Sequence, residues 1–469
     1  MRKLTKIIAT LSDKRCDPAF ISALYQAGMN VARVNTAHQS LESTGSLIAN
    51  VRAVSNNIAI MLDTKGPEIR TSPNGSTLNV SKDDLLKVRG GSGVSAPGNL
   101  FVSLENITSM LTKGNVMMID DGDLALEVID KQDDYLVCQV MNSGEIKTRK
   151  SVNLPGVKVN LPSLTKRDIE FIELAIREDV EFLAHSFVRN ASDVQAIQQI
   201  LDSRKSNVKI IAKIENQEGV DNIDTILPHV YGIMVARGDL AIEIPAEKVP
   251  VIQNDLIDKC IKKRKIVIVA TQMLHSMITS PRPTRAEVND VANAVLSGVD
   301  AVMLSGETAY GEYALESVQM MSRIATATEQ SHQSRESHEI EPHDNEVSGF
   351  LAITAVRASM QLNVKAVIAD TDTGKTARYL AAFRGRCPVY AQCYQNRVMR
   401  ELAMNFGVYA DQIDVATSKK VFTKAVLNKL MATGDLNQED LVVVLAGNFG
   451  KKVGPSFVEV SRVKNLITA

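Results

Sequence analysis

Charged side chains stand directly after short apolar runs of the sequence, where they could do chemistry. Lys213 and Glu215 close the run that begins at 208, with Ile214 between them, and Asp239 follows the next run along the chain. Side chains alternate along a strand, so Lys213 and Glu215 are expected on one face. Two carboxylates with room for water suit Mg²⁺ or Mn²⁺ better than zinc. These residues therefore predict a cation beside a metal site.

Polar residues end the other apolar runs as well, although a buried strand carries them only at an energetic cost. Arg33 adds positive charge, as phosphoryl transfer requires, because charge spreads over the oxygens of the moving group. Gly238 lets the backbone approach a ligand, and the segment after Asp239 is expected to turn N–H groups toward an anion. The other polar strand ends are Asn35, Asp63, Thr64, Lys65, Ser186, Arg189, Thr271, Gln272, Ser305, Glu307 and Thr308.

Eight apolar runs rich in Val and Ile alternate with helical patterns and predict the elements that position these residues. Runs that are apolar on both faces are typical of parallel strands covered by helices, and eight βα units close a TIM (β/α)8 barrel. The strand ends would then gather their polar residues at one mouth. An open, doubly wound sheet is the alternative. The runs are 5–10, 29–34, 58–62, 181–185, 208–214, 231–236, 265–270 and 300–304.

The long gap between the third and fourth runs predicts an inserted domain. From 67 to 155 the pattern changes to short alternating segments with Gly turns, which is typical of a small β-barrel. Since the insertion follows the C-terminal end of a barrel strand, it would stand at the mouth and act as a lid. We assign 1–66 and 156–330 to a discontinuous TIM-barrel catalytic domain and 67–155 to the inserted β-barrel lid domain.

A polar stretch from Thr328 to Glu346 is expected to link the barrel to a C-terminal α/β regulatory domain over 347–469. Its His332, His338 and His343 are six and five residues apart, a spacing that suits no single helix face and disfavours a metal site. Beyond the linker, apolar runs again alternate with helical stretches. The strands expected there are 366–369, 388–391, 441–446 and 457–460.

The composition excludes several kinds of partner. The chain has 469 residues, 53 of them basic and 54 acidic, and a formal net charge of −1, so no basic field attracts nucleic acid or an anionic membrane. The five cysteines form no C-x-x-C pair and are expected to be reduced thiols. No apolar stretch has the length of a signal peptide or a membrane span, which favours a cytoplasmic location.

A segment from Thr371 to Thr376 ends like a Walker A loop but has Ala369 where the first glycine belongs, so it is no nucleotide P-loop. Two interpretations stay open for it, a threonine-rich nest that binds an effector phosphate and a plain helix cap. The candidate effector residues are Thr371, Thr373, Lys375 and Thr376. The chain has no G-x-S-x-G motif, which argues against acyl transfer.

With these residues in place, the sequence resembles the pyruvate kinases over essentially its whole length. The resemblance implies a TIM barrel with a β-barrel lid and a C-terminal regulatory domain, assembled as a homotetramer. It also implies Mg²⁺-dependent transfer of the phosphoryl group of phosphoenolpyruvate to ADP, giving ATP and pyruvate in the last step of glycolysis. The matching segments are Met29–Asn35, Asp63–Arg70, Val152–Gly156, Lys213–Glu215, Gly232–Asp239, Ala270–Leu274, Pro281–Glu287 and Met303–Ala309.

The resemblance further implies a role for each site residue. Lys213 would stabilise the transferring phosphoryl group, Arg33 would grip the substrate phosphate, and Thr271 would help to protonate the enol carbon. Glu215 and Asp239 would hold Mg²⁺. The substrate-binding set would be Arg33, Lys213, Gly238, Asp239 and Thr271, and the nucleotide-binding set would be Asn35, His38, Arg70 and Lys150.

The potassium site of the family is similar to Asn35, Asp63 and Thr64, but Ala37 stands where the family has a serine. One K⁺ ligand is therefore missing. Glu68, by contrast, is the acidic residue typical of potassium-requiring members and favours a K⁺ requirement. A weakened dependence on K⁺ is expected.

Other departures from the family pattern leave two alternatives open. Ala241 replaces a glycine beside the site, His275 replaces an acid, and the short loop from Gly447 to Pro455 weakens the expectation of a sugar-phosphate activator. One alternative is a catalytically weak, effector-binding paralogue, suggested by Ala37 and Ala241. The other is a TIM-barrel Mg²⁺ enzyme acting on pyruvate-like enolates, which would not need the inserted domain.

Overall fold

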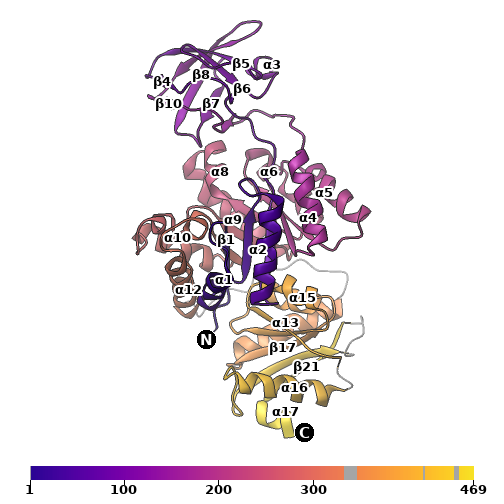
Figure 1. Ribbon diagram of the computed structural model, residues 1–469. Coiled ribbons are helices and arrows are strands. Elements are labelled where there is room, and N and C mark those ends of the chain that lie inside the picture. The colour runs from indigo at the N-terminus through magenta and orange to yellow at the C-terminus, as the bar shows by residue number, and fades with distance from the viewer. Residues whose placement is uncertain (1, 332–345, 416–417, 448–453, 469) are drawn as a thin grey trace.

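The computed structural model describes residues 2–331, 346–415, 418–447 and 454–468. In Figure 1 an all-β region stands at the top, a barrel surrounded by helices lies in the middle, and a second α/β region lies at the bottom. The inserted region joins the barrel through two adjacent connections. None of the described helices is long and apolar enough to cross a lipid bilayer.

Eight parallel strands form a closed barrel, so the expected TIM barrel is confirmed and the open sheet is excluded. Around the barrel the order is β1, β16, β15, β14, β13, β12, β3 and β2, and every neighbouring pair is parallel. The strands are β1 (Lys6–Leu11), β2 (Val31–Asn35), β3 (Ala59–Asp63), β12 (Phe182–His185), β13 (Lys209–Ile214), β14 (Gly232–Ala236), β15 (Ile266–Ala270) and β16 (Ala301–Leu304).

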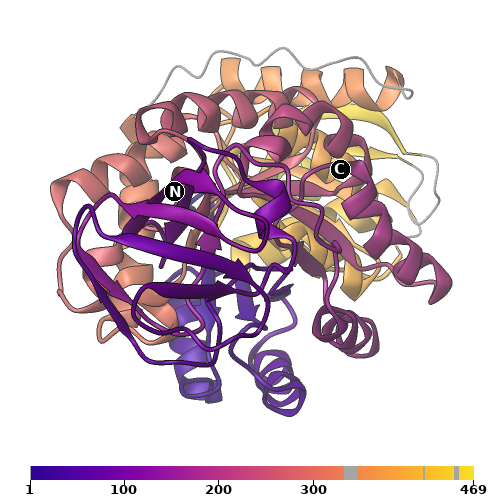
Figure 2. The ribbon, with the colours of Figure 1, turned by 90° about the horizontal axis from the view of Figure 1, so that it is seen from above.

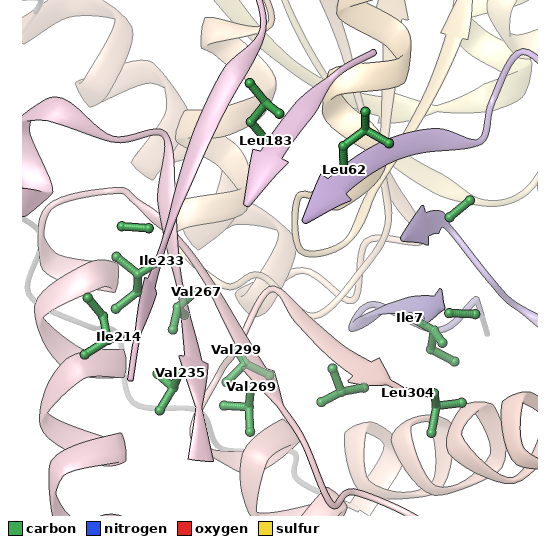
Figure 3. Packing of buried hydrophobic residues seen from close by; sticks show 14 of the residues in the cluster. Ile7, Leu62, Leu183, Ile214, Ile233, Val235, Val267, Val269, Val299 and Leu304 are labelled. Carbon is green, nitrogen blue, oxygen red and sulfur yellow. The ribbon is translucent and has the colours of Figure 1, made fainter. Parts of the chain in front are cut away.

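Alternate residues of the barrel strands enter two separate apolar layers. Ile7, Ile214 and Val267 face outward and pack with helical side chains (Figure 3), whereas Ile8 and Ile268 fill the inside of the barrel. This two-residue period explains why the strand sequences read as continuous apolar runs, since both faces are buried. It also leaves the strand ends as the place where polar side chains meet the solvent.

Several of the helices that cover the barrel begin with capping residues that the sequence supplies. Thr165 and Asp168 form a reciprocal capping box at the start of α4, and Thr284 and Glu287 form another at the start of α10. The elements are α1 (Pro18–Ala27), α2 (Leu41–Val54), α4 (Lys166–Arg177), α5 (Ala191–Ser203), α6 (Gln217–Asp221), α7 (Ile223–Ile226), η1 (Leu227–His229), α8 (Arg237–Glu243), η2 (Ala246–Lys248), α9 (Val249–Lys262), η3 (His275–Ile278), α10 (Arg285–Leu296), α11 (Gly306–Ala309) and α12 (Ala314–Ser331).

The inserted region lies between β3 and β12 and forms a six-stranded sheet and a two-stranded ribbon. Strand pairing does not run continuously around it, but both sheets bury their side chains in one core. Seen from above, it stands over one side of the barrel (Figure 2). Its elements are β4 (Leu78–Val80), β5 (Leu85–Gly90), β6 (Asn99–Val102), α3 (Ile107–Met110), β7 (Val116–Ile119), β8 (Leu124–Lys131), β9 (Leu136–Val140), β10 (Gly144–Ile146) and β11 (Val152–Asn153).

The C-terminal region is a five-stranded sheet in the order β19, β18, β17, β20 and β21, with β21 antiparallel to its neighbour. The sequence analysis missed β19 because it is a short edge strand with polar residues at its end. The elements are α13 (Glu346–Gln361), β17 (Ala366–Thr371), α14 (Lys375–Ala382), β18 (Val389–Cys393), α15 (Asn396–Glu401), η4 (Leu402–Met404), β19 (Val408–Gln412), α16 (Lys419–Ala432), β20 (Leu441–Gly447), β21 (Pro455–Arg462) and α17 (Val463–Thr468).

The expected linker begins too early, because α12 continues as a regular helix to Ser331. The prediction about His332, His338 and His343 lies outside the described residues.

At the opposite end of the barrel from the inserted region, Met404 joins the apolar cluster inside the barrel. The C-terminal region is thereby packed against the barrel floor.

Candidate active site

The C-terminal ends of the barrel strands surround a cavity of about 310 Å³. It opens between β2, β3, β12, β13 and the start of α8. The residues that line it are Arg33, Asn35, Ala37, His38, Asp63, Thr64, Lys65, Glu68, Arg70, Ser186, Phe187, Lys213, Glu215 and Asp239. Most of the site residues expected from the sequence are thus brought together at one mouth.

Asp63, at the end of β3, is the carboxylate that fixes both cations of this cavity. Its Oδ2 accepts from Arg33 Nε at 2.7 Å and lies 2.6 Å from Arg33 Nη2, while its Oδ1 lies 3.2 Å from Lys213 Nζ. Burial would raise the pKa of Asp63, but Lys213 and Arg33 outweigh it and hold the pKa below its ordinary value. Arg33 and Lys213 are therefore held in place before any ligand arrives.

Lys213 lies at the centre of the site, and its side chain is only 12% exposed. Its Nζ donates to Ser186 Oγ at 2.8 Å and lies 2.9 Å from Glu215 Oε1. Burial alone would lower the pKa of Lys213, but the Asp63 and Glu215 carboxylates more than compensate and raise it above the ordinary value. The amine is consequently a fixed positive charge rather than a base.

Glu215 and Asp239 form a pair of crowded carboxylates beside that amine. Burial, followed by repulsion from Glu215, raises the pKa of Asp239 to about 7. Glu215 is 1% exposed; its Oε2 accepts from the backbone N–H of Phe187 at 2.7 Å, and its Oε1 lies 2.9 Å from Lys213 Nζ. A divalent cation fits the raised pKa of Asp239, since it would relieve the repulsion between the two carboxylates.

No group of three or more His, Cys, Asp and Glu side chains within the described residues is arranged to hold a metal. Two carboxylates alone suit Mg²⁺, which keeps waters and shares its coordination with substrate phosphates. They suit a fully enclosed zinc site much less.

Thr271 and Gly238 meet one strand further along the barrel. The Gly238 N–H donates to Thr271 Oγ1 at 2.7 Å, and Arg237 donates to the Thr271 carbonyl at 2.9 Å while pairing with Asp290 at 2.6 Å. Thr271 and Gln272 both have positive φ, 67° and 54°, a strained backbone for side-chain-bearing residues. The Thr271 hydroxyl is therefore held in a fixed position against Gly238, the residue before Asp239.

From the sequence, Gly238 and Asp239 were expected to come before the segment whose N–H groups face an anion. The structure instead includes both residues in that segment. They lie inside α8, whose first residue is Arg237. Their N–H groups belong to the first turn, which still leaves them without partners four residues back in the helix. Ala241, in the same helix, is exposed.

The residues expected to bind K⁺ lie together, but their oxygens already have protein partners. Asn35 Oδ1 accepts from the Ala37 N–H at 3.1 Å, and Thr64 Oγ1 accepts from the Ser186 N–H at 3.1 Å. Both oxygens of Asp63 face cations. The geometry agrees with the missing hydroxyl at Ala37 in offering few free ligands.

The nucleotide-binding candidates are divided between the barrel and the inserted region. His38 and Arg70 line the cavity, and Arg70 Nε donates to Glu68 at 2.7 Å. Lys150 does not line it, and its Nζ lies 2.8 Å from Asp120. Arg70 and Lys150 nevertheless lie side by side in the inserted region, where Arg70 Nη1 donates to the Arg149 carbonyl at 2.6 Å and Arg70 forms a bridge with Ser151.

The effector candidates lie far from this mouth, at the start of α14. Thr373 and Lys375 are exposed, while Thr371 and Thr376 are buried. The helix has the left-handed Gly374 (φ 77°) as its N-cap and no side-chain cap. The capping interpretation of the threonines is therefore wrong, and the phosphate interpretation stays a prediction.

Two structurally important residues, Phe187 and Thr10, were not chosen from the sequence, and Ser186 was named there only as a polar strand end without a role. Ser186 Oγ accepts from Lys213 and donates to the Thr64 carbonyl at 2.6 Å. Phe187 adopts a left-handed conformation, φ 55°, that points its N–H at Glu215. Thr10 Oγ1 accepts from Arg33 Nη1 at 2.9 Å. Ser186 and Thr10 are polar ends of apolar strands, a signal that could have identified them, whereas the backbone twist at Phe187 leaves no trace in the sequence.

Comparison with known proteins agrees with this architecture over the whole chain. The family profile described as pyruvate kinase, barrel domain, matches residues 2–318, and that described as pyruvate kinase, alpha/beta domain, matches residues 350–460. The chain is 44% identical to a pyruvate kinase of Borreliella burgdorferi, covering 99% of this chain and 98% of the relative. It is 40% identical to that of Bacillus licheniformis, covering 100% of this chain and 81% of the relative.

A solved structure shows the same fold. The crystal structure of a pyruvate kinase from Cryptosporidium parvum superimposes with a TM-score of 0.91 at 35% identity, covering 98% of this chain and 96% of that one. On these matches, and on the barrel-mouth geometry that agrees with them, the chain belongs to the pyruvate kinase family.

Proposed function

We propose that this chain transfers the phosphoryl group of phosphoenolpyruvate to ADP, giving ATP and pyruvate as the last step of glycolysis. The observation that carries the proposal is the geometry around Lys213. Its buried ammonium is fixed by Asp63, Glu215 and Ser186, beside the second carboxylate, Asp239, whose pKa is raised by burial and by repulsion from Glu215. Such preorganised charge is the main means by which enzymes stabilise a transferring phosphoryl group.

Each residue then has a defined task. Glu215 and Asp239 would hold Mg²⁺, which when bound supplies positive charge to the phosphate oxygens. Arg33 and Lys213 orient the phosphoryl group and neutralise it, and their positions are set by Asp63. No rotation of either cation is required at the moment of transfer.

The second half of the reaction protonates an enol carbon, and we assign this to the region of Thr271. Its hydroxyl already accepts from Gly238 and donates to the Ala270 carbonyl at 2.6 Å, so its position is fixed by the strained turn. The amides of Gly238 and Asp239 would receive the substrate carboxylate, for which the Gly238 N–H would give up its hydrogen bond to Thr271 Oγ1. His38 and Arg70 at the mouth, with Asn35 and with Lys150 from the inserted region, would receive ADP as the inserted region closes over it as a lid.

The decisive experiment measures pyruvate formed from phosphoenolpyruvate and ADP with Mg²⁺, for the wild type and Lys213→Met. The variant should lose activity by a factor of about 10³, the order expected for removal of a preorganised charge. Lys259→Met, which removes a peripheral lysine paired with Asp224 at 2.9 Å, is the matched control and should keep full activity.

A wild type that makes no pyruvate, or a Lys213→Met variant that matches it, would contradict the proposal. The paralogue alternative predicts the first result together with retained effector binding. The alternative of another enolate enzyme predicts turnover of a pyruvate-like acid without ATP formation.

We further propose a homotetramer in the cytoplasm, with an effector phosphate at Thr371, Thr373, Lys375 and Thr376. Exposed apolar side chains on α13, Val347 at 61% and Phe350 at 69%, support a subunit contact there. The five cysteines carry free thiols, in keeping with a reducing compartment. Light scattering tests the assembly, and adding fructose bisphosphate without any change in substrate affinity would contradict the effector site.

A further inference from the structure

A second cavity, of about 250 Å³, lies between the two connections of the inserted region and the helix α6. The outgoing connection lines it with Pro67 and Ile69, and the returning connection lines it with Leu154, Val157 and Leu161. It adjoins the active-site cavity without being part of it, since the two have only three lining residues in common, Glu68, Phe187 and Asp239.

Both connections are clamped where they meet the barrel. The buried Asp168 accepts from the N–H groups of Lys65 and Gly66 at 3.0 and 3.3 Å, which fixes the outgoing chain. Arg189 donates to the carbonyls of Val159 and Leu161 at 2.8 and 2.9 Å, which fixes the returning chain. Any movement of the inserted region must therefore bend the stretches between these clamps, and those stretches form the wall of the cavity.

The charge around this cavity is predominantly negative. Glu218 and Asp221 of α6 and Glu243 of α8 line it, and none of the three has an ion pair within the described residues. Of its two basic residues, Arg189 is already engaged by Asp193 at 2.9 Å, and Lys158 is exposed. Burial raises the pKa of Glu243 even though a hydrogen bond with Asn153 lowers it, so a positive group nearby would favour its charged form.

The walls between those carboxylates are apolar. Side chains from both connections and Phe187 face the space, which is smaller than the roughly 300–1,000 Å³ of sites for drug-sized ligands. A molecule with an apolar body and one positive group would complement such a lining. Its positive group would pair with the carboxylates, and its apolar body would remove the apolar walls from water.

We propose that this cavity binds a small organic cation, an alkyl or aryl ammonium, and that the bound cation holds the inserted region at one angle to the barrel. Binding follows from the cavity alone. The second clause rests on the proposed function, because the consequence of a fixed inserted region is slower turnover of phosphoenolpyruvate and ADP.

Calorimetric titration of the full chain with 4-phenylbutylamine tests the binding clause. The double variant Glu218→Gln, Asp221→Asn should bind about tenfold more weakly, since two favourable charge contacts are lost. Glu170→Gln, which neutralises an exposed carboxylate on α4, should bind like the wild type. 4-Phenylbutyrate, which has the same apolar body and the opposite charge, should not compete.

The binding clause would be overturned by any one of three results. These are equal binding of the amine and the acid, unchanged affinity in the double variant, and no binding of the amine at millimolar concentration. Unfolding curves of both variants establish that they fold. Leu161→Trp, which fills the cavity without altering charge, should abolish binding through a second and independent change.

The same amine added to the pyruvate-forming assay tests the second clause. Inhibition that disappears in the double variant supports it, and binding without any change in rate overturns it. A chain that makes no pyruvate under any condition contradicts the proposed function, while the calorimetric result still decides whether the cavity binds a cation.

Discussion

Buried charge occurs at both ends of the barrel, but the two ends use it differently. At the floor, where the C-terminal region packs, Arg384 and Asp300 form an ion pair of 2.7 Å with side chains only 3% and 2% exposed. Asp300 also accepts from the N–H groups of Val267 and Phe406, and Arg384 Nε donates to the Gly298 carbonyl. Both members of this pair are satisfied by the protein itself.

At the mouth, the carboxylates are not all balanced by protein cations. Glu215 Oε1 lies 2.9 Å from Lys213 Nζ, and burial together with repulsion from Glu215 raises the pKa of the adjacent Asp239 to about 7. The comparison shows how a structural ion pair differs from a functional one. A satisfied pair joins two parts of the fold, whereas an unsatisfied cluster has capacity for a metal and a substrate.

The largest effect that would sharpen this comparison is expected from Glu215→Gln. Removing one of two metal-binding carboxylates should lower pyruvate formation about 10³-fold at saturating substrate. Stability should change little, because the relief of repulsion with Asp239 is opposed by the loss of the ion pair with Lys213, which keeps Asp63 as its partner. The measurements are the rate over a range of Mg²⁺ concentrations and the melting temperature, and a destabilised variant with a normal rate would reverse our view of the mouth.

The opposite pattern is expected at the floor. Arg384→Met leaves Asp300 buried without its cation and should lower the free energy of unfolding by about 3–5 kcal/mol. The rate per folded molecule should stay close to that of the wild type, since Arg384 contacts no part of the mouth. Urea unfolding with a parallel assay of the soluble fraction checks both, and a lost rate at unchanged stability would break the comparison.

A buried neutral group beneath the mouth should make stability depend on pH. Burial lowers the pKa of His185 to about 4 from the ordinary 6.5, against the raising effect of Asp193 and Asp168. Below pH 6.5 His185 binds a proton in the unfolded chain but stays neutral in the folded chain. The free energy of unfolding is therefore highest above pH 6.5 and decreases as the pH falls toward 4.

Between pH 7.5 and 5 this loss should amount to about 2 kcal/mol in the free energy of unfolding. His185→Asn should show a shallower decline when urea unfolding is measured at both values. Parallel curves for the two proteins would mean that His185 does not titrate in this way.

A smaller effect is expected from Ser186→Ala, which removes one acceptor from Lys213 but leaves Asp63 and Glu215. Because a single hydrogen bond to a charged group is lost, kcat should fall about tenfold with little change in stability. Ser203→Ala, on the exposed end of α5, is the control. A kcat equal to that of the wild type would show that the carboxylates position Lys213 alone.

The smallest effect concerns K⁺. With Ala37 in place of a hydroxyl, the rate in K⁺ should exceed the rate in tetramethylammonium by less than it does for Ala37→Ser. Equal rates for the wild type in both salts would mean that no K⁺ is used. A strong K⁺ requirement that Ala37→Ser does not increase would contradict the expectation.

The sequence by itself determined the barrel and the grouping of its main candidate site residues. All eight apolar runs became strands, and Lys213, Glu215 and Asp239 are grouped as their positions at strand ends predicted. The reason is that strand periodicity and parallel topology bring every strand end to one mouth, so a local pattern defines a tertiary location.

Only the tertiary structure decided how those residues are held and what lies beside them. The twist at Phe187 that satisfies Glu215, the start of α8 at Arg237, the edge strand β19 and the cavity under the inserted region all depend on contacts between residues distant in sequence. No local pattern encodes such contacts, because a backbone conformation, a helix start or a cavity is set by what packs against it from elsewhere in the chain.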